Sequence, residues 1–233
     1  MLKSYGKTVL ILGATGNTGK YAVQHALNAQ DDVHVFVRDP AKLSAVIKDQ
    51  IHVIVGNLTE SSAMMDAVVK VSPTAIIICS GHPPKDPIGP LNSTAVAAIV
   101  KALIETQRLE DCFVVYLSGL FSDPFYDPLP WYTRFLRAVL LPMCGYQALL
   151  RDNLEVTKYL TAGEGLKRGL RFTIVRMGYP INAPSKGAII PVDYYPLGAV
   201  TFNDIGLFLV KLAHGEHRDA VLGKAIKPFY TRN

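Results

Sequence analysis

Residues 9–20 read Val-Leu-Ile-Leu-Gly-Ala-Thr-Gly-Asn-Thr-Gly-Lys, so that three glycines follow an apolar run directly. The run predicts a buried strand, and the residues from Gly19 onward have helical spacing. Glycines at such a turn permit a tight bend, let a ligand approach the backbone, and let the helix pack closely on the strand. Because a helix N-terminus attracts negative charge, the turn predicts a site for a dinucleotide pyrophosphate. The residues expected to form it are Gly13, Thr15, Gly16, Asn17, Thr18 and Gly19.

Two other interpretations of the glycine turn need consideration. A mononucleotide phosphate loop of the Walker A type needs glycine at position 14 and serine or threonine at position 21, whereas the chain has Ala14 and Tyr21. A purely structural glycine turn stays open as an alternative.

Apolar runs rich in β-branched residues alternate with stretches of helical spacing along the chain. The expected strands are Thr8–Leu12, Val33–Val37, His52–Val55, Ala75–Cys79, Phe113–Leu117 and Phe172–Val175. The expected helices are Gly19–Ala29, a short one after Pro40, Ser61–Val69, Thr94–Thr106, Asn153–Ala162 and Asp204–His214, the last with Thr201 or Asn203 as its N-cap. This alternation predicts an α/β fold with a doubly wound parallel sheet.

The segment 121–146 interrupts the alternation after the fifth strand. It is rich in proline and aromatic residues and contains Trp131, the only tryptophan. Ligands of open α/β sheets bind beyond the carboxyl ends of the strands, so the segment is predicted to be an inserted lid over a substrate or a surface for homo-oligomer assembly. The sequence favours neither, and residues 1–233 are otherwise expected to form one domain.

The end of the second strand predicts which cofactor binds. An acidic residue there binds a ribose 2′-hydroxyl, whereas basic residues accommodate a 2′-phosphate. Arg38 lies about twenty residues past the turn, and Lys42 lies where it can converge with Arg38 on a phosphate. NADP(H) is therefore the expected cofactor, although Asp39 would favour NAD if its carboxylate faced the ribose.

Composition limits the remaining classes. The net charge of +5 is spread along the chain, which argues against nucleic acid as a partner. The odd number of cysteines, three, and the lack of a secretory leader or a long apolar run predict a cytoplasmic protein without a membrane partner. No metal site is expected: His214 and His217 lack a third ligand, and His25, His34 and His52 stand singly among apolar residues.

The order of the motifs resembles that of atypical short-chain dehydrogenases of the Rossmann type. These motifs are Gly13–Gly19, Val37–Asp39, Gly56–Leu58, Ser118-Gly119 and Arg171–Gly178. Within that superfamily the chain is similar to the biliverdin reductase B or flavin reductase branch and to NmrA-like relatives. The resemblance implies that Asn57 and Leu58 flank the adenine, that Ser80 and Gly81 line the cofactor, and that Ser118 approaches the nicotinamide.

The chemistry departs from that of most short-chain dehydrogenases. They use a Tyr-x-x-x-Lys pair as acid or base, and none of the eleven tyrosines here is followed by lysine four residues later. Flavins and quinones accept hydride as stabilised anions that solvent can protonate, so their reduction needs no such pair. Ser118 and Tyr179, the latter after the sixth strand as a stacking residue or proton donor, are the predicted catalytic residues.

Two functions from different classes remain. The first is an NADPH-dependent reductase that transfers hydride to a planar conjugated acceptor of the flavin, quinone or tetrapyrrole class. The second is a non-catalytic NADP sensor of the NmrA type that binds a protein partner. A reductase needs an open cavity above the nicotinamide, whereas a sensor can fill it with Trp131, Tyr146 or Tyr179.

Overall fold

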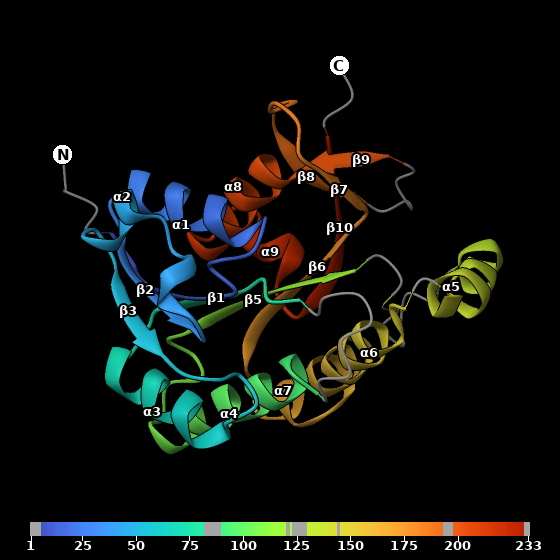
Figure 1. Ribbon diagram of the computed structural model, residues 1–233. Coiled ribbons are helices and arrows are strands. Elements are labelled where there is room, and N and C mark those ends of the chain that lie inside the picture. The colour runs from blue at the N-terminus through green and yellow to red at the C-terminus, as the bar shows by residue number, and fades with distance from the viewer. Residues whose placement is uncertain are drawn as a thin grey trace.

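The computed structural model describes residues 6–81, 90–119, 122, 130–143, 145–192 and 198–230. In these residues eight strands form one sheet in the order β3-β2-β1-β4-β5-β6-β10-β8 (Figure 1). Every neighbouring pair is parallel except β10 and β8, which run antiparallel. The strands are β1 (Thr8–Leu12), β2 (Asp32–Val37), β3 (His52–Val55), β4 (Ala75–Ile78), β5 (Phe113–Gly119), β6 (Arg171–Met177), β8 (Ile189–Val192) and β10 (Lys224–Tyr230), and a separate pair is β7 (Tyr179–Ile181) with β9 (Ala199–Thr201).

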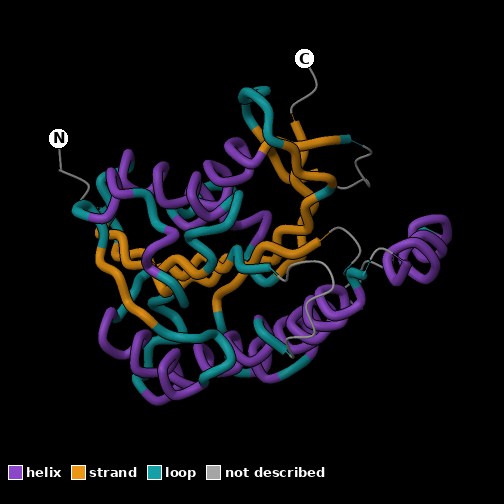
Figure 2. The backbone as a smooth tube through the Cα atoms, in the orientation of Figure 1, coloured by secondary structure: helices purple, strands orange, loops and turns teal. Residues whose placement is uncertain are grey.

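Helices cover both faces of the sheet, as Figures 1 and 2 show. One core contains the residues that α1 and α8 bury against the strands, and the other contains those of α3, α4 and α6. The central strands are mostly apolar because both of their faces are buried, as in β4, where all four residues are buried. The helices are α1 (Gly19–Asn28), α2 (Ala45–Lys48), α3 (Ser61–Val71), α4 (Asn92–Glu105), α5 (Trp131–Met143), α6 (Gln147–Ala162), α7 (Glu164–Lys167), α8 (Phe202–Ala213) and α9 (Arg218–Val221), with a 3-10 turn, η1 (Pro40–Lys42).

The predicted fold class is confirmed. The six expected strands are β1 to β6, and their bounds agree with the prediction within two residues at each end. The N-cap of α8 is Thr201, whose Oγ1 accepts a hydrogen bond from the Asp204 amide at 3.1 Å.

The prediction missed elements in two regions. It gave no helix between residues 121 and 146, where α5 forms, and it began the next helix at Asn153, whereas α6 begins at Gln147. Residues 121, 123–129 and 144 of this segment lie outside the described part. It also missed the short elements α7, β7, β9 and α9, and the strands β8 and β10. The last two each contain a proline, and Pro191 and Pro228 lie opposite each other in the antiparallel pair. The pairing of β10 with β6 ends at Ile226, so Pro228 needs no N–H for it.

Helix α5 stands away from the body of the molecule (Figure 1). Large apolar side chains recur every four residues along it and are exposed, at Trp131, Phe135, Val139 and Met143. They fall on one side of the helix. No helix in the described residues is long and apolar enough to cross a membrane.

A buried carboxylate ties the C-terminal strands to α8. Asp204 accepts hydrogen bonds from the Ser185 hydroxyl, from the Lys186 amide at 2.9 Å and from the Tyr230 hydroxyl at 2.8 Å. Burial alone would raise the pKa of this carboxyl, but the hydrogen bonds outweigh it and hold the pKa below the usual value of 3.8. Asp204 therefore anchors the loop before β8 and the end of β10 in its charged form.

Replacing this carboxylate should destabilise the protein in a pH-dependent way. We expect Asp204→Asn to lower the free energy of unfolding by about 2–3 kcal/mol at neutral pH, because three donors lose a charged acceptor. Since the folded-state pKa lies below the unfolded value, the stabilisation is present above about pH 4 and is lost as the pH falls below it. Urea denaturation of the native protein and of the variant, at pH values from about 3 to about 7, measures the difference in the free energy of unfolding. The exposed Asp66→Asn is the control, and an equal effect of both variants would contradict the prediction.

Candidate functional site

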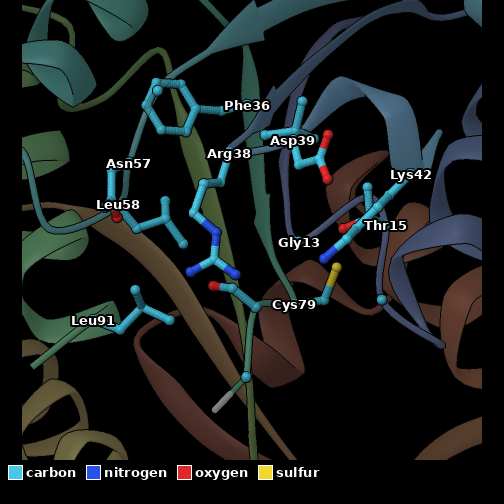
Figure 3. A pocket seen from close by; sticks show the side chains of 15 residues that line it. Gly13, Thr15, Phe36, Arg38, Asp39, Lys42, Asn57, Leu58, Cys79 and Leu91 are labelled. Carbon is cyan, nitrogen blue, oxygen red and sulfur yellow. The ribbon is translucent and has the colours of Figure 1, made fainter. Parts of the chain in front are cut away.

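A pocket of about 210 Å³ opens at the carboxyl ends of β1 and β4 (Figure 3). The sheet order reverses between these two strands, since β2 lies on one side of β1 and β4 on the other. Such a reversal is where open parallel sheets bind ligands. The pocket is lined by Gly13, Thr15, Gly16, Phe36, Val37, Arg38, Asp39, Lys42, Gly56, Asn57, Leu58, Cys79, Ser80, Gly81 and Leu91.

The glycine turn forms one wall of the pocket. Gly13 has a φ of +81°, which favours glycine, and a Cβ there would lie 2.5 Å from the Ser80 amide nitrogen. The Gly16 amide donates to the Gly13 carbonyl at 2.9 Å, which closes the turn. A Cβ on Gly19 would lie 2.0 Å from the Gly13 carbonyl oxygen, so that position requires glycine for α1 to pack on β1. Gly16 is exposed at the pocket instead.

Arg38 and Lys42 both line the pocket, one from the end of β2 and one from η1. In Figure 3 the Arg38 side chain extends into the pocket toward the level of Cys79, and the Lys42 amino group points toward the glycine turn. The Asp39 carboxylate caps η1 by accepting a hydrogen bond from the Ala41 amide at 3.0 Å. The two cations are therefore placed for an anionic group, while the neighbouring carboxylate is engaged by the backbone.

The opposite wall is apolar and comes from β2, β3 and the start of α4. Leu58 and Leu91 lie on this side in Figure 3, with Phe36 above them. Gly56 leaves room for Phe36, since a Cβ on Gly56 would lie 2.3 Å from the Phe36 ring and would displace it. The Asn57 side-chain oxygen, Oδ1, accepts a hydrogen bond from the Thr59 amide at 3.2 Å and shapes the turn after β3. Flat apolar walls of this kind suit a heteroaromatic base.

A buried polar network supports the floor of the pocket. The Ser80 hydroxyl donates to Asn92, whose amide nitrogen donates back to the Ser80 carbonyl at 3.2 Å. Asp152 of α6 accepts from the backbone amides of Asn92 at 2.8 Å and Ser93 at 3.0 Å, and from the Ser93 hydroxyl at 2.7 Å. Asp152 thereby caps α4 from another helix. The residue before α4, Leu91, has no side chain that could do so.

The network continues to the end of β5. The buried Tyr116 hydroxyl donates to the side-chain oxygen of Asn153, and Ser118 Oγ lies 2.6 Å from Ser122 Oγ. Burial and the nearby Asp152 carboxylate raise the pKa of Tyr116 well above its usual value, and hydrogen bonds to Asn92 and Ser118 only oppose this rise. Tyr116 is therefore neutral at physiological pH and is positioned as a structural donor.

The structure brings most of the predicted cofactor residues to one pocket and leaves others outside it. Nine of them line it: Gly13, Thr15, Gly16, Arg38, Lys42, Asn57, Leu58, Ser80 and Gly81. Asn17, Thr18 and Gly19 follow the turn without lining it, and Thr18 precedes the first residue of α1. Ser118 is buried at the end of β5, and Tyr179 is exposed at the start of β7. Residues 82–89, 120–121 and 123–129, which follow β4 and β5, lie outside the described part.

Five lining residues were not assigned to the site from the sequence, namely Phe36, Val37, Gly56, Cys79 and Leu91, although Val37 and Gly56 lie in the motifs named above. Phe36 and Cys79 could have been assigned to the site because they lie near strand ends. Because they are apolar, their pattern instead indicates core residues. The Cys79 thiol donates to the Leu12 carbonyl at 3.2 Å, and burial raises its pKa to about 12. Cys79 is therefore a thiol and not a nucleophile at neutral pH.

The prediction that His25, His34 and His52 are isolated among apolar residues is wrong. The His25 ring lies 2.7 Å from the Asn203 side-chain oxygen, and His34 and His52 both lie beside Asp32. Among the described residues, Asp32, His34 and His52 form the group whose ligand atoms lie close enough together to hold a metal ion.

The glycine turn gives a test that separates ligand binding from folding. Gly16→Val should lower NADPH affinity by at least about a hundredfold, since a β-branched side chain fills the space beside the backbone, and should cost less stability than Gly19→Val, because a Cβ on Gly16 would lie 3.2 Å from the Gly13 carbonyl oxygen. Gly19→Val should instead lower the melting temperature markedly, because its Cβ cannot fit against Gly13. Circular dichroism, thermal melts and cofactor titration measure both. Unchanged NADPH binding by Gly16→Val would exclude the turn as the pyrophosphate site.

Solved structures of similar fold include oxidoreductases from several bacteria. A wide-type short-chain dehydrogenase/reductase from Veillonella parvula in complex with NADP matches with a TM-score of 0.69 and 16% identity over 95% of this chain and 94% of that one. ChuY, an anaerobillin reductase from Escherichia coli O157:H7, matches with a TM-score of 0.69 and 15% identity over 97% and 99%. The oxidoreductase ylbE from Lactococcus lactis matches with a TM-score of 0.71 and 16% identity over 97% and 91%.

At these identities the likeness concerns the fold. The family model described as NAD(P)H-binding matches residues 13–216, which begin at the first glycine of the turn and include every residue that lines the pocket. The chain thus belongs to the NAD(P)H-binding family of Rossmann-like proteins.

Proposed function

We propose that the protein is an NADPH-dependent reductase that transfers hydride to a planar conjugated acceptor of the flavin, quinone or tetrapyrrole class. The observation that carries this proposal is the pocket itself, where a glycine turn, an apolar wall and two cations face one another at the sheet reversal. These parts suit the pyrophosphate, the adenine and the 2′-phosphate of NADPH respectively.

The preference for NADPH over NADH rests on Arg38 and Lys42. Both side chains line the pocket, and the one carboxylate beside them, that of Asp39, has one oxygen bound to the Ala41 amide. Arginine binds phosphate through paired donors, and lysine adds a second charge. In the alternative, Asp39 would bind a ribose hydroxyl through Oδ2 while Oδ1 keeps the Ala41 amide, so the comparison of NADPH with NADH binding must decide between the two.

The acceptor class follows from what the site offers for proton transfer. The tyrosine nearest the end of β5, Tyr116, is buried, donates to Asn153 and has a raised pKa, so it is a poor acid for a substrate alkoxide. A conjugated acceptor forms a stabilised anion that solvent protonates. The name of the structural neighbour ChuY, an anaerobillin reductase, agrees with a tetrapyrrole as one member of this class.

We place the acceptor beyond the carboxyl ends of β5 and β6, between Ser118 and Tyr179. Ser118 would approach the nicotinamide, and the exposed Tyr179 ring would stack on the acceptor. The segment 121–146 would cover it as a lid or would join two copies of the chain. For a lid, α5 would have to move, since it stands away from the body in Figure 1.

The sensor alternative would fill the cavity with aromatic side chains. Trp131, Tyr146 and Tyr179 are exposed, at 81%, 36% and 74%, so none of the three rings is buried in a filled cavity. This supports a reductase.

The free thiols of Cys79 and Cys112, in the described part of the chain, agree with a reducing cytoplasmic location. The proposed partner is a small molecule rather than nucleic acid.

Cofactor choice tests the role of the two cations. NADPH should bind more tightly than NADH by about 1.5–3 kcal/mol, and Arg38→Ala should remove most of this difference. Because Arg38 and Lys42 are exposed, the difference should shrink at high salt. Calorimetric titration of both cofactors measures it, with the exposed Arg134→Ala as control. Equal affinities for the two cofactors in the native protein would contradict the assignment.

Acceptor choice tests the chemistry. NADPH oxidation should be fast with flavins or quinones and poor with unactivated ketones, and Tyr179→Ala should raise KM more than it lowers kcat, as expected for lost stacking. Steady-state assays with a small panel of acceptors measure this. Efficient reduction of a simple ketone that is lost in Tyr116→Phe would show instead that Tyr116 is the acid.

A further inference from the structure

Three side chains with metal-binding groups meet at the amino ends of β2 and β3. Asp32 is the first residue of β2, His34 is two residues later on the same strand, and His52 is the first residue of β3. His34 and His52 are register partners in the parallel pair. The cofactor pocket lies at the carboxyl ends of the strands, so this cluster is at the opposite ends of the strands from the pocket.

The three side chains lie in contact with one another. His34 Nε2 lies 3.0 Å from Asp32 Oδ2, and His52 Nε2 lies 3.3 Å from Asp32 Oδ1. The two imidazole rings are stacked with their centroids 4.6 Å apart and an interplanar angle of 23°. One ligand atom from each residue lies within 4.8 Å of the other two.

We propose that Asp32, His34 and His52 form a binding site for Zn²⁺. Zinc binds imidazole nitrogen at about 2.0–2.1 Å and carboxylate oxygen at about 2.0–2.2 Å, and a tetrahedral arrangement of such ligands places them about 3.4 Å apart. The nitrogen–oxygen distances of 3.0 and 3.3 Å are near this value, but each nitrogen faces a different oxygen of the Asp32 carboxylate, so binding through one oxygen requires the exposed His52 ring to shift. Two imidazoles and one carboxylate leave the fourth position to water.

The cluster combines a fixed part and an adaptable part. The His34 side chain is only 18% exposed, whereas His52 is 68% exposed and can rotate to bring its Nε2 nearer to that of His34. A neutral imidazole can carry its proton on Nδ1, so Nε2 is available to the metal without loss of a proton from the ring. Lys70 lines the cavity beside His34 and His52, and its charge should moderate the affinity without supplying a ligand.

Zinc at this position would join the edge strand to the rest of the sheet. In the described residues β3 pairs with β2 alone, and Val53 and Val55 of β3 are exposed. The carboxyl end of β3 leads into Gly56, Asn57 and Leu58 of the pocket wall. A metal bridge between the first residues of β2 and β3 would therefore hold the strand that carries this wall.

Titration with zinc chloride tests the site directly. After removal of any affinity tag, the protein should bind one Zn²⁺ per chain by isothermal titration calorimetry, and its melting temperature should rise with zinc concentration. Asp32→Asn, His34→Gln and His52→Gln should each weaken binding by at least about tenfold. With Co²⁺ as the probe, the native protein should show the visible absorption of a tetrahedral complex, and the variants should lose it.

A second histidine–aspartate pair supplies the matched control. His214 Nε2 lies 2.9 Å from Asp31 Oδ2, but Asp31 is buried and the pair has no third ligand among the described residues. His214→Gln should leave zinc affinity unchanged. Binding of zinc that survives in all three cluster variants, or failure of the native protein to bind one Zn²⁺, would overturn the proposal; neither outcome depends on the reductase function.

Discussion

The structure depends on how closely β1, α1 and β4 approach one another at the glycine turn. A Cβ on Gly19 would lie 2.0 Å from the Gly13 carbonyl oxygen, and a Cβ on Gly13 would lie 2.5 Å from the Ser80 amide nitrogen. Since real side chains cannot occupy such distances, the two glycines allow the helix and both strands to meet around one point. The pocket exists at that point because backbone, and not side chains, forms its nearest wall.

Buried carboxylates fix the positions of the helices relative to the sheet. Asp152 connects α6 to the start of α4, and Asp204 connects α8 to the C-terminal strands. A carboxylate is stable inside a protein only where several donors face it, so each one requires its surroundings to keep one arrangement. The apolar cores on the two faces of the sheet fill space, whereas these polar contacts fix how the helices are placed on it.

The sequence predicted the features that depend on local pattern. The strands β1 to β6 and the glycine turn each combine an apolar run with a turn signal, so their places could be predicted from neighbouring residues alone. Gly13, Arg38 and Ser80 could be assigned to one pocket because strand ends of a parallel sheet share an edge.

The features that were missed depend on contacts between distant residues. The cap that Asp152 provides to α4 spans about sixty positions of sequence, and its pattern matches no local motif. His34 and His52 are adjacent only because β2 and β3 pair in one register, and a shift of that register by one residue would separate them. The α5 helix was missed because prolines surround it and because its apolar side is exposed, so that its sequence lacks the pattern of a helix packed on a core.

The cap on α4 also has a consequence for the orientation of a dinucleotide. Two helices, α1 and α4, begin beside the pocket, and the N-terminus of each carries partial positive charge. The first amides of α4 already bind the Asp152 carboxylate, so a phosphate arriving there would meet a fixed negative charge. In the described part of the chain no side chain caps α1. The pocket is thus electrically asymmetric, and we expect a diphosphate to bind at the start of α1 rather than at the start of α4, which would give the molecule that carries it one direction in which to lie.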